Sequence, residues 1–316
     1  MPISEKEAIA SFRILVALAK ADGVLHVEER ATLESALADI TLPKGVTLKN
    51  LLDEETNVDA QLKLLTSDEA KDACYTSAYA MAYSDGACTG DEKKLLEHIK
   101  KTLNLPDEKT TILGRMFAEA KDTVTPSNIS SISDPTQRAK EVKEDTLKYS
   151  ILSAILGAFP VPGLAIFTDL AVVGVQVKLI RDIGQYYGHR IDKTAARSLL
   201  LGVGVGTGAR IAVSNLAKFV PGFGSAVGAT TSFASTYAVG RMAVGYFENG
   251  GKVEMAVLKK AFTDAQKEGK EEFAKNKDKV AAKQKETEAR VKQLAADRKA
   301  GKISEAEYEK KIDELA

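Results

Sequence analysis

Two short stretches decide the fold of the first third of the chain: residues 19–29, Ala-Lys-Ala-Asp-Gly-Val-Leu-His-Val-Glu-Glu, and residues 82–92, Ala-Tyr-Ser-Asp-Gly-Ala-Cys-Thr-Gly-Asp-Glu. Each follows an alanine-rich segment with helical periodicity and ends in a glutamate that begins another such segment. Glycine supplies the backbone angles of a tight turn, and aspartate accepts backbone N–H bonds there. The stretches therefore predict an internal repeat of helix, turn and helix.

The acidic residues of this repeat, Asp22, Glu29, Asp85 and Glu92, have two interpretations. A glutamate at a helix N-terminus opposes the macrodipole, so Glu29 and Glu92 are expected as structural caps. Alternatively, each aspartate and glutamate pair provides the oxygen ligands that a hard divalent cation prefers. The spacing does not match an EF-hand loop, so divalent metal binding stays a hypothesis beside the capping interpretation.

Further helices extend outward from the repeat. Ser4 and Glu7 form a capping-box pattern that predicts the start of the first helix. The chain is rich in alanine, lysine, glutamate and leucine, which favour helix over strand, and it contains no tryptophan. We therefore expect an all-α protein. Helical periodicity places the helices of the head at residues 4–21, 27–39, 67–83, 92–103 and 106–120.

Composition excludes some classes of partner and compartment. The chain has 44 basic and 44 acidic residues, and this zero net charge argues against nucleic acid as a main partner. Cys74 and Cys88 form no CxxC pair, which favours a reducing compartment without structural disulfides. Residues 1–10 lack the basic and then apolar pattern of a signal peptide, so the head is expected in the cytoplasm.

The repeated motifs Ala-Lys-Ala-Asp-Gly-Val (residues 19–24) and Ala-Tyr-Ser-Asp-Gly-Ala (residues 82–87) resemble those of the TerB-like family, which is linked to tellurite resistance. The resemblance covers residues 4–122. It implies a compact helical domain with an acidic surface, a part in a membrane-linked stress response, and metal sensing. It implies no catalytic reaction.

Composition changes along the chain predict four segments. These are a TerB-like helical domain at residues 1–124, a linker at 125–144, an apolar helical domain at 145–250 and a charged helical tail at 251–316. The linker prediction rests on the proline, serine and asparagine content that begins at Thr125.

The apolar segment leaves three interpretations open. Residues 149–168 carry no charged side chain and approach the length of a membrane span, but residues 160–163, Pro-Val-Pro-Gly, divide them. Spanning or re-entrant hairpins would bury Asp169 and Arg210 at substantial cost unless they were paired. An amphipathic bundle on the membrane surface and a wholly soluble bundle are the alternatives. The glycine run at residues 202–208 lacks the Lys-Ser/Thr of a phosphate-binding loop, so we interpret it as a helix-packing surface.

An ordered set of motifs in this segment resembles the YcjF-type bacterial domain of unknown function, which is found beside Era-like GTPases. The resemblance covers residues 145–247. It implies association with the inner membrane and a separate Era-like GTPase as partner, because this chain contains no GTPase motif. The motifs are Phe159-Pro160-Val161-Pro162-Gly163, Thr168-Asp169, Gln176, Tyr187-Gly188, Arg210 and Pro221-Gly222-Phe223-Gly224.

The tail is expected to form a long solvated helix over residues 253–294, followed by a short hairpin. Gly301 ends one helix, and Ser304 with Glu307 caps the next. This end resembles the short C-terminal oligomerisation motif of many bacterial proteins, which implies a homo-oligomer. The apolar contacts that the resemblance assigns are Ile303, Tyr308, Ile312 and Leu315.

The sequence contains neither a nucleophile elbow nor an HExxH motif, so we expect a non-enzymatic protein without a cofactor. The expected function is a membrane-associated scaffold or sensor in bacterial envelope or metal stress response, with membrane lipid as partner. Its expected location is the cytoplasmic side of the inner membrane, peripheral or integral, with the cytoplasm as alternative. A self-assembling adaptor for a GTPase and a divalent-metal-binding protein are the alternative functions.

Overall fold

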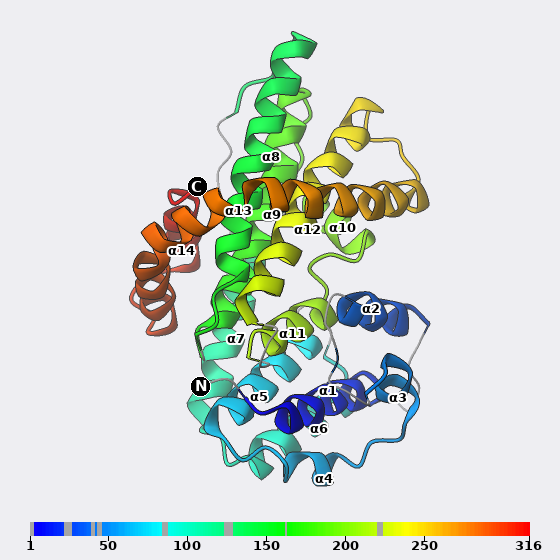
Figure 1. Cartoon of the computed structure of the whole chain (residues 1–316), viewed down its shortest axis with the longest axis vertical. Helices are drawn as coiled ribbons and strands as arrows, with labels where there is room; N and C mark the ends of the chain where they lie inside the picture. The colour runs from blue at the N-terminus through cyan, green and yellow to red at the C-terminus, as the bar shows by residue number, and fades with distance from the viewer. Residues whose placement is uncertain are drawn as a thin grey trace. The chain divides into compact units, whose positions relative to one another are not determined.

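The residues that the computed structural model describes form fourteen α-helices and no β-strand, which confirms the all-α prediction (Figure 1). The described residues are 3–21, 27–38, 42, 46–83, 88–122, 129–161, 163–219 and 224–316. The chain folds into two compact units, and each unit has its own set of buried apolar side chains.

Unit 1 consists of residues 1–121, 159–169 and 206–228. Its first helix begins as the capping box predicts, because Ser4 and Glu7 exchange the expected hydrogen bonds. The helices of unit 1 are α1 (Glu5–Ala19), α2 (Val27–Ala38), α3 (Leu48–Asp53), α4 (Val58–Leu62), α5 (Asp68–Tyr83), α6 (Gly90–Thr102), α7 (Asp107–Asp122) and α11 (Gly208–Ala217).

Helix α5 forms the centre of unit 1. Every side chain from Ala73 to Ala82 is buried, and the alanines among them allow neighbouring helices to approach closely. Helix α11 packs against α5, α2 and α1. Its Asn215 Nδ2 donates a buried hydrogen bond of 2.9 Å to Ser77 Oγ of α5. A helix from the apolar segment thus completes the core of the head.

Unit 2 consists of residues 122–158, 170–205 and 229–316. The apolar segment predicted as one domain at residues 145–250 is therefore divided between the two units. Unit 1 likewise extends beyond the head predicted at residues 1–124, because it includes residues 159–169 and 206–228. The helices of unit 2 are α8 (Pro135–Gly157), α10 (Lys193–Gly202), α13 (Met255–Lys299), α14 (Glu305–Asp313) and most of α9 (Ala165–Tyr186) and α12 (Gly224–Glu248).

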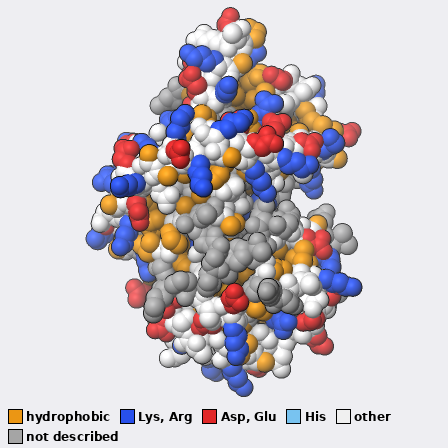
Figure 2. Space-filling view, viewed as in Figure 1, with side chains coloured by type: hydrophobic (Ala, Val, Ile, Leu, Met, Phe, Trp, Pro, Cys, Tyr) orange, Lys and Arg blue, Asp and Glu red, His pale blue; other side chains and the backbone are white. Residues whose placement is uncertain are grey.

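Helix α13 is 45 residues long and crosses α8 and α12 (Figure 1). Its buried side chains recur mostly at intervals of three, four or seven residues, which keeps them on one helix face. On the face shown in Figure 2, acidic and basic side chains are interspersed over α13. The helix is therefore amphipathic, with a narrow buried stripe and a solvated charged surface, as the tail prediction required.

The predicted C-terminal hairpin is present within the chain. Ser304 and Glu307 form the capping box of α14, and Gly301 adopts a positive φ of 70° after α13. Arg298 and Glu305 form a buried ion pair with an Nε–Oε2 distance of 2.7 Å. Two of the expected oligomerisation contacts, Tyr308 and Ile312, are buried in this single chain. The homo-oligomer stays a prediction.

Two local predictions need correction. The linker predicted at residues 125–144 becomes helical at Pro135, because proline suits the first turn of a helix and the Asp134 side chain caps it. The glycine run was expected to form a helix-packing surface. This holds at Gly202, where an added Cβ would clash with the Met255 side chain of α13, but Gly204 and Gly206 have positive φ angles of 83° and 73°. A Cβ at Gly204 would meet nothing within 4 Å, so this glycine serves a turn and not a close contact.

Candidate functional site

Only part of the predicted metal site can be placed. Asp22 and Asp85 lie outside the described residues, and the same holds for the side chain of Glu29. Glu92 Oε2 accepts the Thr89 N–H at 2.8 Å, while Thr89 Oγ1 accepts the Glu92 N–H at 3.2 Å. Glu92 is thus a helix cap, as the first interpretation required.

No group of three or more histidine, cysteine, aspartate or glutamate side chains that could hold a metal ion occurs among the described residues. Since three of the four predicted carboxylates are not described, divalent metal binding by the Asp-Gly turns stays a prediction.

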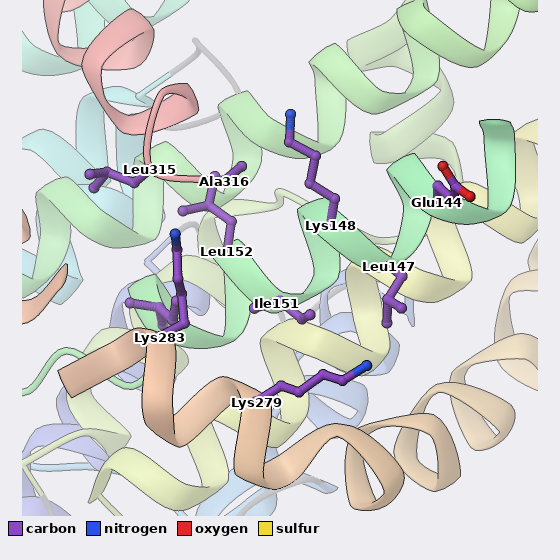
Figure 3. A pocket seen from close by; sticks show the side chains of 10 residues that line it. Glu144, Leu147, Lys148, Ile151, Leu152, Lys279, Lys283, Leu315 and Ala316 are labelled. Atoms are coloured by element: carbon purple, nitrogen blue, oxygen red, sulfur yellow. The ribbon is translucent and has the colours of Figure 1, made fainter. Parts of the chain in front are cut away.

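A groove with a volume of about 390 Å³ lies in unit 2 between α8, α13 and the last two residues (Figure 3). We call it the α8–α13 groove. Both helices contribute side chains at helical spacing, so one face of each helix lines it. The lining residues are Glu144, Leu147, Lys148, Ile151, Leu152, Ile155, Lys279, Lys283, Leu315 and Ala316.

The floor of the groove is aliphatic. Leu147, Ile151 and Ile155 follow one another at intervals of four residues and form a continuous row on α8. Leu152 and Ile155 are buried, while Leu147 and Ile151 remain half-exposed. Figure 3 shows Leu147 and Ile151 directed toward α13. Part of the apolar row is therefore accessible to a ligand.

The rim of the groove is cationic, because three lysines, Lys148, Lys279 and Lys283, line it together with one acidic side chain, Glu144. Lys279 is exposed and forms no ion pair with any described residue. The nearest carboxylate to Lys283 belongs to Glu286, at 3.9 Å. The Lys148 ammonium lies 5.3 Å from the ring centroid of Tyr149. Lys279 without an ion pair to a described residue, Lys283 paired only at 3.9 Å and an apolar floor together suit an anionic amphiphile.

A buried polar network fixes the opposite face of α8 to α9. Lys178 Nζ donates to Tyr149 Oη at 2.8 Å and to Asp182 Oδ2 at 2.5 Å. Tyr186 Oη donates to Asp145 Oδ2 at 2.9 Å. Burial raises the pKa of Tyr149, and the Asp182 carboxylate raises it further, so this phenol stays protonated. The network holds the wall of the groove in place.

Two charged residues of the apolar segment pair with each other in unit 1. Asp169 Oδ1 and Lys218 Nζ form a buried ion pair at 2.6 Å. Burial raises the pKa of Asp169, and the Lys218 ammonium opposes that rise. This pairing is the compensation that a buried Asp169 was expected to need. Within the described part of the chain, we find no helix with both the length and the apolar character of a membrane span.

The groove could not be identified from the sequence. The sequence contained one indication of the groove: Lys279 and Lys283 are one helical turn apart and therefore lie on one face of α13. It was hidden by the many other lysines of the tail. Nothing in the sequence indicated that this face lies beside Leu147 and Ile151.

No family model matches the chain, and no solved structure matches it significantly. Magnetosome membrane protein 22 of Magnetospirillum gryphiswaldense is 34% identical to the chain over 122 residues. The match covers 35% of this chain and 60% of that protein, so the chain spans less than two thirds of its relative. The TerB-like and YcjF-type resemblances stay predictions.

Proposed function

We propose that this chain is a non-enzymatic bacterial protein that attaches peripherally to a membrane and acts there as a scaffold or sensor. The observation that carries the proposal is the α8–α13 groove, with accessible Leu147 and Ile151 beside the ammonium groups of Lys279 and Lys283. Anionic headgroups attract such lysines, and acyl chains cover such leucines and isoleucines. The similarity to a protein named for the magnetosome membrane supports the same kind of location.

The stress-response role, the side of the membrane and the GTPase partner are proposed from the resemblances alone. The TerB-like repeat supports a role in envelope or metal stress, and the YcjF-type motifs support a place at the cytoplasmic side of the inner membrane. A separate Era-like GTPase is the partner that the second resemblance suggests. The geometry of the groove supports contact with lipid and none of these further roles.

Co-sedimentation with vesicles tests the attachment. The full chain should pellet with vesicles that contain an anionic phospholipid and remain in solution with purely zwitterionic vesicles. Each lysine near an anionic membrane contributes roughly 1 kcal/mol, or about a fivefold change in binding. Reversing the charge of both rim lysines in Lys279→Glu/Lys283→Glu should therefore reduce vesicle binding more than tenfold, by a rough estimate.

The matched control is Lys277→Glu/Lys285→Glu. These lysines are exposed on the same helix, but two residues correspond to about 200° of helical rotation, so they face away from the groove. The control should keep most of the binding. Met255 and Val257 are large apolar side chains that lie exposed at the N-terminal end of α13. If Met255→Ser/Val257→Ser abolished binding while the rim variant kept it, the groove would not be the membrane contact.

A further inference from the structure

We infer that the α8–α13 groove binds one medium-chain fatty-acid anion, with its acyl chain along the apolar row of α8 and its carboxylate at Lys283. This inference rests on the proposed function, because it names the lipid component that the same site recognises. Three features support it: the size of the groove, the chemistry of its floor and the distribution of charge along it.

The size favours a single small amphiphile. A volume of about 390 Å³ lies near the lower end of the range for small-molecule sites, roughly 300–1,000 Å³. The row from Leu147 to Ile155 extends about 12 Å, because an α-helix rises about 1.5 Å per residue. This length accommodates the extended part of one acyl chain beside α8.

The chemistry of the lining selects the class of ligand. Its apolar residues are all aliphatic, and none of the ten lining residues is aromatic. The groove thus offers no stacking surface for a nucleobase, and its floor offers no hydrogen-bonding side chain for a sugar. An alkyl chain, by contrast, gains from burial of its methylene groups against leucine and isoleucine.

The charges orient the ligand. Figure 3 shows Glu144 at one end of the groove, and Lys283 with Leu315 at the other. A carboxylate is repelled by Glu144 and attracted by the half-buried Lys283, whose nearest acidic partner is 3.9 Å away. The head of the fatty acid therefore lies at Lys283, and the chain extends toward Leu147.

Isothermal titration with dodecanoate, below its micelle concentration and without vesicles, tests the inference on the full chain. We expect saturable binding of one dodecanoate per chain. Lys283→Gln, which removes the charge but keeps a polar side chain, should weaken binding at least fivefold. Lys285→Gln, on the opposite face of α13, should bind as the wild type does. Ile151→Trp should abolish binding by filling the groove, and circular dichroism checks its fold.

Dodecyltrimethylammonium, which has the same chain and a cationic head, should not bind. Absence of saturable dodecanoate binding, equal affinity in Lys283→Gln, or equal binding of the cationic amphiphile would each overturn the inference. If anionic vesicles bind but dodecanoate does not, the proposed membrane association stands and this inference fails. If dodecanoate binds and vesicles do not, the ligand assignment stands and the membrane association fails.

Discussion

Glu7 joins the beginnings of two helices in unit 1. Its Oε2 accepts the N–H and hydroxyl of Ser4, while its Oε1 accepts the N–H of Ser67 at 2.8 Å and that of Thr66 at 3.1 Å. Burial alone would raise the pKa of Glu7, but the hydrogen bonds from Ser67 and Ser4 together outweigh it and hold the pKa well below its ordinary value of 4.5. A buried carboxylate of this kind stabilises the fold only while it is ionised.

Glu7→Gln should destabilise the chain by about 2–4 kcal/mol, because the amide places a donor against donors. A depressed pKa contributes stability above the unfolded value, near 4.5, and that contribution is lost as the pH falls. We therefore expect the free energies of unfolding of wild type and Glu7→Gln, measured with urea, to become more similar below pH 4.5. Glu5→Gln, an exposed neighbour in the same turn, should have a far smaller effect. An equal difference at every pH would contradict this account.

The buried pair of Asp169 and Lys218 predicts strong coupling. Asp169→Leu or Lys218→Met alone should cost about 3–5 kcal/mol, because each leaves one buried charge without its partner. The double variant should recover most of that loss, since no charge then remains buried. Urea unfolding of the four proteins gives the coupling energy. Additive losses would show that the two charges do not stabilise each other.

At the scale of the helices, α13 depends on a close approach at one glycine. A Cβ at Gly269 would lie 2.8 Å from the Cα of Ala234 and 2.9 Å from its carbonyl oxygen, both backbone atoms that cannot move aside. Gly245 in α12, in contrast, has nothing within 4 Å of the Cβ position. The first glycine is required by packing, whereas the second is not.

Gly269→Ala should therefore destabilise the chain by about 1–3 kcal/mol through overpacking. Gly245→Ala should stabilise it by up to about 1 kcal/mol, because alanine favours helix. Thermal unfolding followed by circular dichroism compares the two. A gain in stability for both variants would show that α13 does not pack against α12 at this point.

Strong local signals allowed most of the longer helices of unit 1 and the long helix α13 to be predicted. The capping residues Ser4 and Ser304 fixed the starts of α1 and α14 correctly. The short helices α3 and α4, of six and five residues, were missed because they contain too few turns to show a period. The linker prediction was wrong at Pro135, where the preceding Asp134 already indicated a helix start.

At the scale of the whole chain, each compact unit is built from segments that lie far apart in the sequence. Residues 206–228 belong to unit 1, and α11 covers α5 there. The groove likewise combines α8 with α13, which lie far apart in sequence. A single sequence shows which face of each helix is apolar, but it does not show which two faces meet. The all-α class could thus be predicted, whereas the site could not.

This arrangement predicts that a fragment of residues 1–124 is incomplete. Without α11, the buried side chains of α5 that contact it would face water. The fragment should unfold at a lower temperature than the full chain, with low cooperativity, and it should self-associate. A synthetic peptide of residues 206–228 should restore a cooperative transition. A fragment that is monomeric and unfolds cooperatively without the peptide would contradict the assignment of α11 to the head.

Hydrogen–deuterium exchange of the full chain, with and without anionic vesicles, tests the membrane attachment most directly, because it reports where the lipid contact lies. We predict slower exchange at residues 144–155 and 279–287 when anionic vesicles are added, and no change with zwitterionic vesicles. Unchanged exchange at both segments, with protection elsewhere or nowhere, would contradict the proposed attachment through the α8–α13 groove.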